Sequence, residues 1–227
     1  MRIELTVFLF LSIASGADSL AQSTQPSSEI SARVTNNEEM KAIFITDQMD
    51  RGNNPFAHPG DLQPKPLTDS EIRKNDDARD IRVKEMLDAG LLHTGADFFR
   101  AALVLQHSGV SSSTLLAHIL ASIAVAKGDS DGLWLSAATL DRYLRQINQK
   151  QIFGTQFKSL PGQTKPPYSF VQDDLEPGLL SDSIRAEFCV TPLSAQTKGL
   201  PGEPAGTGMF PCPVHTQMKN RATTKSK

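Results

Sequence analysis

Polar residues stand where helical spacing predicts an apolar core, and three of them have the chemistry of acid–base catalysis. His107 follows a stretch in which Phe99 and Leu103 share one face, while Asp47 and Asp141 interrupt two other apolar faces. A histidine oriented by a carboxylate is the arrangement that general acid–base catalysis uses. His107 with Asp47 or Asp141 is therefore the catalytic candidate.

The same helices carry amide, hydroxyl and guanidinium groups suited to binding. These candidate binding residues are Gln48, Arg51, Gln106, Arg142, Gln151, Thr155 and Gln156. A buried carboxylate or amide without partners costs several kcal/mol, so we expect these groups to pair with one another. Asp47 or Asp141 would pair with Arg51 or Arg142, bridged by Gln106. Two interpretations fit: a structural network that fixes helix register, or a ligand pocket in which the arginines bind an anionic group.

Metal ligands are poorly placed, and we expect no metal and no cofactor. His107 and His118 lie in consecutive helices of a tight hairpin. Helix rise and helix separation put them about 12–14 Å apart, too far to share one zinc ion. His58 and Asp61 in a Pro-rich loop are the other pair, but loop histidines are usually just exposed. The chain also lacks G-x-S-x-G, H-E-x-x-H, P-loop and G-x-G-x-x-G motifs.

Helices are the elements predicted to position these residues. The segment 31–51 has helical spacing of its apolar residues. After an irregular Pro-rich loop over 52–67, a capping box of Thr68 and Glu71 begins a highly charged helix that ends at Gly90.

Three further helices with short connections are predicted over residues 94–147. The first begins at Thr94 or Gly95, and Asp129 or Ser130 caps the third. Short connections favour antiparallel neighbours. We therefore expect an all-α fold, a small antiparallel helical bundle or helix-hairpin array, with an α-solenoid-like array as an alternative.

The N-terminus, residues 1–21, is typical of a secretory signal peptide. Arg2 supplies a short positive region, residues 5–13 are apolar, and small residues permit cleavage after Gly16 or after Ala21. A buried N-terminal helix is the alternative. The sequence therefore favours export to the periplasm or the extracellular space.

Composition divides the rest of the chain into three parts. Residues 22–30 have the composition of a linker, 31–157 form the predicted helical domain, and 158–227 are a Pro/Gly-rich extension expected to be irregular and partly disordered. Cys189 and Cys212 are the two cysteines. In an exported chain they favour a disulfide, which would contribute about 3 kcal/mol by restricting the unfolded chain.

Charge and hydropathy exclude two classes of partner. Lys and Arg number 23 against 25 Asp and Glu, a formal net charge of -2, so nothing favours nucleic-acid binding. The N-terminal apolar run is too short to span a bilayer, so we expect no membrane span after signal removal. The partner is left as an unidentified ligand or protein.

Four fragments together resemble an uncharacterised bacterial family, a domain of unknown function. They are DQMDR at 47–51, QHS at 106–108, DRYL at 141–144 and QIFGTQ at 151–156. That family carries D-Q-x-x-R, Q-H-[SGA], D-R and Q-x-[YF]-G-T-Q in this order. The resemblance covers about half the chain, adds Gly154 to the set of singled-out residues, and implies a domain without implying an activity. Family members usually end near G-T-Q, which leaves the extension with a separate role.

The stretch QKQIFGTQF, residues 149–157, is predicted to close the domain. Gly154 would end the preceding helix in the left-handed conformation, and Phe153 and Phe157 would anchor the turn in the core. The sequence then favours an exported helical protein that serves as a binding or interaction module. The alternatives are a hydrolase using His107 with Asp47 or Asp141, and a purely structural envelope protein.

Overall fold

The structure is a computed structural model, and it describes residues 34–55, 57, 61–159 and 170–196. These residues belong to one compact unit. The predicted signal peptide, the predicted linker and Cys212 lie outside the described residues.

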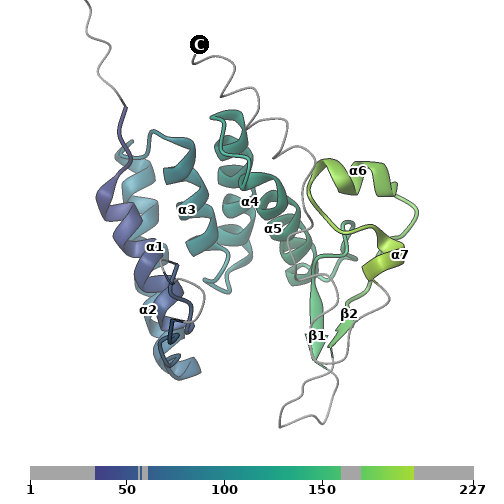
Figure 1. The fold of residues 1–227 in the computed structure, drawn as a ribbon, viewed down its shortest axis with the longest axis horizontal. Coiled ribbons are helices and arrows are strands. Elements are labelled where there is room, and N and C mark those ends of the chain that lie inside the picture. The colour runs from purple at the N-terminus through teal and green to yellow at the C-terminus, as the bar shows by residue number, and fades with distance from the viewer. Residues whose placement is uncertain (1–33, 56, 58–60, 160–169, 197–227) are drawn as a thin grey trace, which may run out of the picture. The chain divides into compact units, whose positions relative to one another are not determined.

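The described chain is all-α apart from one small hairpin, as the sequence predicts. In chain order its elements are α1 (Glu38–Asp50), α2 (Asp69–Asp88), α3 (Gly95–Leu105), α4 (Ser111–Ala126), α5 (Gly132–Gln146), β1 (Phe157–Ser159), β2 (Phe170–Gln172), α6 (Asp182–Glu187) and α7 (Leu193–Gln196). Figure 1 shows α1 and α2 beside α3, followed by α4 and α5 in sequence order. This is the succession expected of helical hairpins with short connections.

Local capping interactions set the helix ends that the sequence predicts. Thr68 and Glu71 form the expected reciprocal capping box at the start of α2. Thr94 is the N-cap of α3, where Asp97 completes a second capping box. Gly90 follows α2 with φ of +65°, the left-handed conformation predicted for a terminator.

The two ends of α5 differ from the prediction. Its N-cap position is Asp131, which makes no side-chain capping bond, while Asp129 accepts a hydrogen bond from the backbone N–H of Asp131. At the other end, Asn148 adopts the left-handed conformation with φ of 59°. Asparagine tolerates that conformation because its short polar side chain bonds locally. Gly154 lies further along the chain and does not end the helix.

Small residues let the central helices approach closely. The larger core cluster contains Ala101, Ala102, Ala117 and Ala121 together with leucine and methionine side chains. At Gly132 an added Cβ would lie 2.5 Å from the carbonyl oxygen of Ala121, so α5 packs against α4 at a distance that only glycine permits.

The described part of the predicted extension contains more regular structure than its Pro/Gly content suggests. β2 pairs antiparallel with β1, with Phe157 opposite Gln172 and Lys158 opposite Val171. α6 and α7 follow β2. A second core cluster joins Val190 from this region to Ala137 of α5, so the helical domain does not end structurally at residue 157. No helix among the described residues is both long enough and apolar enough to cross a membrane.

Candidate functional site

A network of ion pairs joins α1 to α2. We call Asp47, Asp50, Arg51, Asp76 and Arg79 the ion-pair network. Asp47 is fully buried, and its Oδ1 accepts from Arg51 Nη1 at 2.8 Å. The other terminal nitrogen of Arg51 donates to Asp76 Oδ2 at 2.6 Å. Arg79 bonds both Asp76 and Asp50. Each buried charge therefore has an opposite charge beside it, which is the condition under which burial is tolerated.

His107 lies just after α3 and contacts this network. Its Nδ1 is 3.3 Å from Asp47 Oδ1, and 18% of its side chain is exposed. A carboxylate only accepts, so a hydrogen bond between them places a proton on Nδ1, and Nε2 has no partner among the described residues. Gln48 Nε2 donates to the other oxygen of Asp47 at 2.8 Å. The predicted pairing of Asp47 with Arg51 and His107 is thus present.

Asp141 is engaged elsewhere, by residues 151–156, which we call the strap. Its Oδ1 accepts from the backbone N–H groups of Ile152 and Phe153 at 2.8 and 3.0 Å. Its Oδ2 accepts from the backbone N–H and the hydroxyl of Thr155 at 2.9 and 2.8 Å. Asp141 is fully buried. Four donors saturate this carboxylate, and no arginine takes part.

Two glutamines bond the strap to itself, to Asp173 directly after β2, and to α5. Gln151 Oε1 accepts from the backbone N–H of Gln156 at 2.9 Å, and Gln151 Nε2 donates to the carbonyls of Gln156 and Asp173 at 3.0 and 2.9 Å. Gln156 Nε2 donates to the carbonyl of Ala138 in α5 at 3.1 Å. Gln151 is fully buried and Gln156 nearly so, which supports a structural role for both amides.

Residues of α6 and α7 cover the strap. Arg185, 1% exposed, donates to the carbonyls of Ile152 and Phe153 at 3.1 and 3.2 Å. Gln196 Nε2 donates to the Phe153 carbonyl at 3.1 Å. Gly154 has φ of +87°, and an added Cβ would lie 2.1 Å from Gln196 Oε1. Glycine is therefore required at this position by both conformation and space.

Arg142 links the two polar regions. Its Nη1 donates to the backbone carbonyl of Gln106 at 3.1 Å, and its Nε donates to Gln156 Oε1 at 3.3 Å. Both acceptors are neutral. Burial lowers the pKa of Arg142, and the positive charges of Arg145 and Arg51 lower it further. Arg142 is thus a half-buried cation without a carboxylate partner among the described residues.

The structure therefore divides the predicted cluster. Asp47, Gln48, Arg51 and His107 lie together in or beside the ion-pair network, whereas Asp141, Gln151, Thr155 and Gln156 form the strap region. Gln106 contributes its backbone carbonyl in place of the predicted side-chain bridge. The predicted option of an Asp141 pair with Arg51 or Arg142 is absent, because the strap occupies both oxygens of Asp141.

These networks also contain polar residues that were not singled out in the sequence. Asp76 and Arg79 continue the stripe formed by Val83 and Met86 at helical spacing, so the signal that identified Asp47 was present for them too. That signal is hard to recognise in the sequence because α2 is charged on most of its surface. Arg185 and Gln196 lie in the Pro/Gly-rich extension, where no periodic pattern precedes them.

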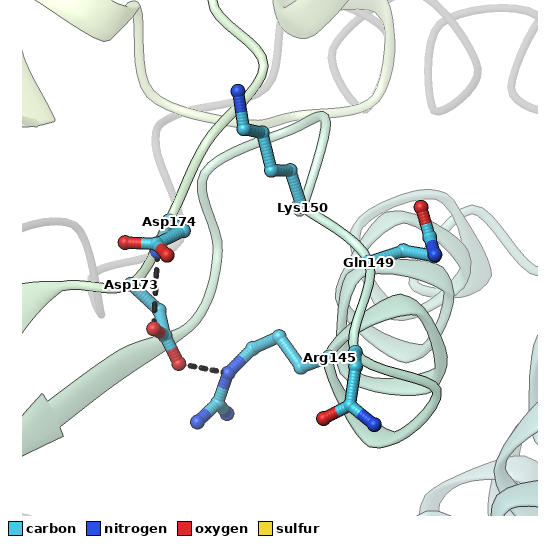
Figure 2. A pocket seen from close by; sticks show the side chains of 6 residues that line it. Arg145, Gln149, Lys150, Asp173 and Asp174 are labelled. Carbon is cyan, nitrogen blue, oxygen red and sulfur yellow. Dashed lines mark hydrogen bonds and ion pairs between the residues drawn. The ribbon is translucent and has the colours of Figure 1, made fainter.

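A cavity of about 390 Å³ lies at the C-terminal end of α5. It is lined by Arg145, Asn148, Gln149, Lys150, Asp173 and Asp174. Figure 2 shows Arg145 reaching Asp173, whose carboxylate also accepts from the backbone N–H of Asp174. None of the residues singled out in the sequence lines it. Within the described ranges, no group of three or more His, Cys, Asp or Glu side chains is arranged to hold a metal ion.

Comparison of the chain with protein-family models, curated proteins and solved structures finds no match. The resemblance based on the four fragments stays a prediction. Functional inference for this protein therefore rests on the geometry of its own residues.

Proposed function

We propose that this protein is an exported binding or interaction module whose ligand or partner meets the polar residues around His107 and Arg142. Neither nucleic acid nor a lipid bilayer is the proposed partner, given the net charge of -2.

One observation carries the proposal: the two candidate carboxylates are fully hydrogen-bonded within the protein, whereas His107 and Arg142 each keep a nitrogen without a partner in the described part of the chain. Asp47 and Asp141 are fully buried and bonded on both oxygens. His107 Nε2 and Arg142 Nη2, in contrast, have no partner among the described residues, and both side chains are partly exposed. Polar atoms that are held in place but left unpaired are suited to a ligand.

A hydrolase is the alternative, and one contact favours it. Asp47 on the Nδ1 side of His107 leaves Nε2 as a proton acceptor, the orientation that a general base needs. Against it, no hydroxyl or thiol in the described chain is hydrogen-bonded to His107, so the nucleophile would have to be water. Asp141 as the orienting carboxylate has less support, because its four bonds hold the strap.

A paired assay separates binding from hydrolysis. Purified wild-type protein would be mixed with neutral, cationic and anionic small molecules in a thermal-shift screen, and with chromogenic ester, phosphoester and glycoside substrates. We expect at least one ligand class to raise the melting temperature, with no turnover. Turnover that disappears in His107→Ala and persists in the exposed-histidine control His93→Ala would establish the hydrolase instead.

Export and the disulfide form a second, separately testable part of the proposal. N-terminal sequencing of protein from the native host should show cleavage after Gly16 or after Ala21, and an intact Met1 would contradict it. Mass spectrometry with and without reduction should show that Cys189 and Cys212 are linked. Cys189 is buried at 2% exposure, which suits a cystine better than a reactive thiol.

A further inference from the structure

Two arginines lie one turn apart on α5, and the protein fixes the orientation of each. Residues three apart on a helix face the same side. Arg142 is held through Nε and Nη1 by Gln156 and by the carbonyl of Gln106. Arg145 is held through Nε by Asp173 Oδ2. Each guanidinium group therefore presents its remaining donors in a set direction.

The two anchors are themselves adjacent. The backbone N–H of Asp173 donates to the carbonyl of Gln156 at 3.1 Å. Gln151 Nε2 donates to the carbonyls of both residues, which fixes their spacing. Arg142 and Arg145 are consequently bonded to two adjacent residues, Gln156 at the end of the strap and Asp173 directly after β2.

Three terminal nitrogens stay available at this place. Nη2 of Arg142 and both terminal nitrogens of Arg145 have no hydrogen-bond partner in the described part of the chain. Arg145 is 33% exposed and lines the cavity of about 390 Å³. Figure 2 shows its terminal nitrogens without a dashed line, while its Nε reaches Asp173.

Arg145 and Lys158 share one carboxylate, that of Asp173, and Arg142 has only neutral acceptors among the described residues, while Asp174 also lines the cavity. Asp173 is the one described carboxylate that contacts either arginine, and Lys158 Nζ bonds its other oxygen at 2.9 Å. The pKa of Arg142 is lowered by burial, by the charge of Arg145 and, least, by that of Arg51, which is itself paired with Asp47 and Asp76. Like charges this close repel one another, and a bound anion would relieve that repulsion.

We propose that Arg142 and Arg145 form a receptor for the oxyanion group, phosphate or carboxylate, of a small ligand whose remainder occupies the cavity beside Arg145. The planar fork of guanidinium donors matches the oxygens of such groups. The inference rests on the proposed binding function and names its ligand class. Asn148 and Gln149 lie at the cavity and supply uncharged donors and acceptors for the rest of the ligand.

Isothermal titration calorimetry on the full chain at low ionic strength tests the receptor. The probes are inorganic phosphate and succinate, with sodium chloride of matched ionic strength as the reference. We expect saturable binding of at least one probe, and the stronger of the two identifies the group. Arg145→Gln should weaken that binding at least tenfold. Arg82→Gln removes the same charge from an exposed ion pair with Glu39 and should leave binding unchanged.

Two results of the titration would overturn the receptor. One is the absence of saturable binding of either probe. The other is an equal loss in Arg82→Gln and Arg145→Gln, which would reveal diffuse attraction by charge. If Arg145→Gln does not fold, NMR of the wild type replaces the variant. The side-chain signals of Arg142 and Arg145 should then shift when the probe is added, and the Arg82 signal should stay in place. A shift of Arg82 alone contradicts the proposal. If neither phosphate nor succinate binds but a neutral or cationic ligand does, the oxyanion receptor is excluded and the proposed binding function is retained.

Discussion

The ion-pair network and the strap both bury an aspartate completely, yet they satisfy it with different partners. Asp47 is surrounded by guanidinium groups, by the amide of Gln48 and by the ring of His107. Asp141 is surrounded by backbone N–H groups and one hydroxyl. In the first case ion pairs between side chains hold α1 and α2 together. In the second case a carboxylate on one helix accepts the backbone N–H groups of an irregular segment, whose carbonyls are bonded by Arg185 and Gln196.

The difference has an energetic consequence. A charge in the ion-pair network has several opposite charges nearby, so the loss of one partner leaves the others in place. Asp141 has no substitute, because its donors are backbone groups that would be buried without an acceptor. We therefore expect the strap to be the more sensitive of the two regions.

Asp141→Asn should give the largest effect. The new amide nitrogen would face two of the donors that now bond to the carboxylate, and we expect a loss of about 3 kcal/mol in the free energy of unfolding. Urea denaturation followed by circular dichroism measures it. Asp77→Asn, at an exposed position on α2, is the matched control and should leave the midpoint unchanged. Equal midpoints for the two variants would show that the strap does not depend on Asp141.

Gly154→Ala should be next in size. The added methyl group meets Gln196 Oε1 and Gln172 Nε2 at 2.1 and 2.6 Å, in a backbone with positive φ. We expect a loss of about 2 kcal/mol from strain and crowding together. Gly90→Ala separates the two causes, because Gly90 has positive φ and nothing within 4 Å of an added Cβ. Its cost should be about 1 kcal/mol, and an equal cost at both positions would exclude crowding at the strap.

Asp47→Asn tests the other side of the comparison and should cost less, about 1–2 kcal/mol. Arg51 keeps its bond to Asp76 in this variant, so no buried charge is left alone. The same urea titration applies. A loss larger than that of Asp141→Asn would reverse the comparison between the two regions. The variant should also move the NMR signals of the His107 ring protons, since the carboxylate beside Nδ1 is removed.

Acid sensitivity in the ion-pair network should be the smallest effect and should involve Asp50. Burial raises the pKa of this carboxyl, but hydrogen bonds from Arg79 and Asn75 and the charges of Arg79 and Arg51 outweigh it and hold the pKa below its ordinary value. The stabilisation is then complete above the unfolded pKa of about 3.9 and is lost as the pH falls through the lower folded-state value.

The urea midpoint of the wild type should accordingly fall between pH 5 and pH 3, and that of Asp50→Asn should fall less. Asp77→Asn again serves as the control, and its urea midpoint should depend on pH as that of the wild type does. A steeper decline in Asp50→Asn than in the wild type would mean that the folded-state pKa of Asp50 is not lowered.

Features set by neighbours in sequence were predictable, and features set by distant partners were not. The capping box of Thr68 and Glu71 and the left-handed Gly90 depend on contacts within one helical turn, and the sequence predicts both. The partner of each buried polar residue depends on which helix lies opposite. Helical spacing shows that Asp141 faces inward, but it does not show that a segment ten residues later supplies four donors.

The candidate site illustrates the same limit. One set of polar residues was expected to gather in one place, and the structure separates it into two regions joined by Arg142. Arg145 was not singled out because it stands at an unremarkable position near a helix end. Its relevance comes from its distance to Arg142 and from Asp173, 28 residues away in sequence.

The side chain of Gln151 acts as a substitute for a backbone peptide group. A primary amide has the same planar arrangement of one acceptor and donors as a peptide group, and Gln151 presents it to both the N–H and the carbonyl of Gln156. It therefore takes the place of a peptide group beside the residue that precedes β1, at a buried position where an unpaired backbone N–H would cost free energy. A single side chain thus extends backbone-like pairing from the hairpin into the strap without a further strand.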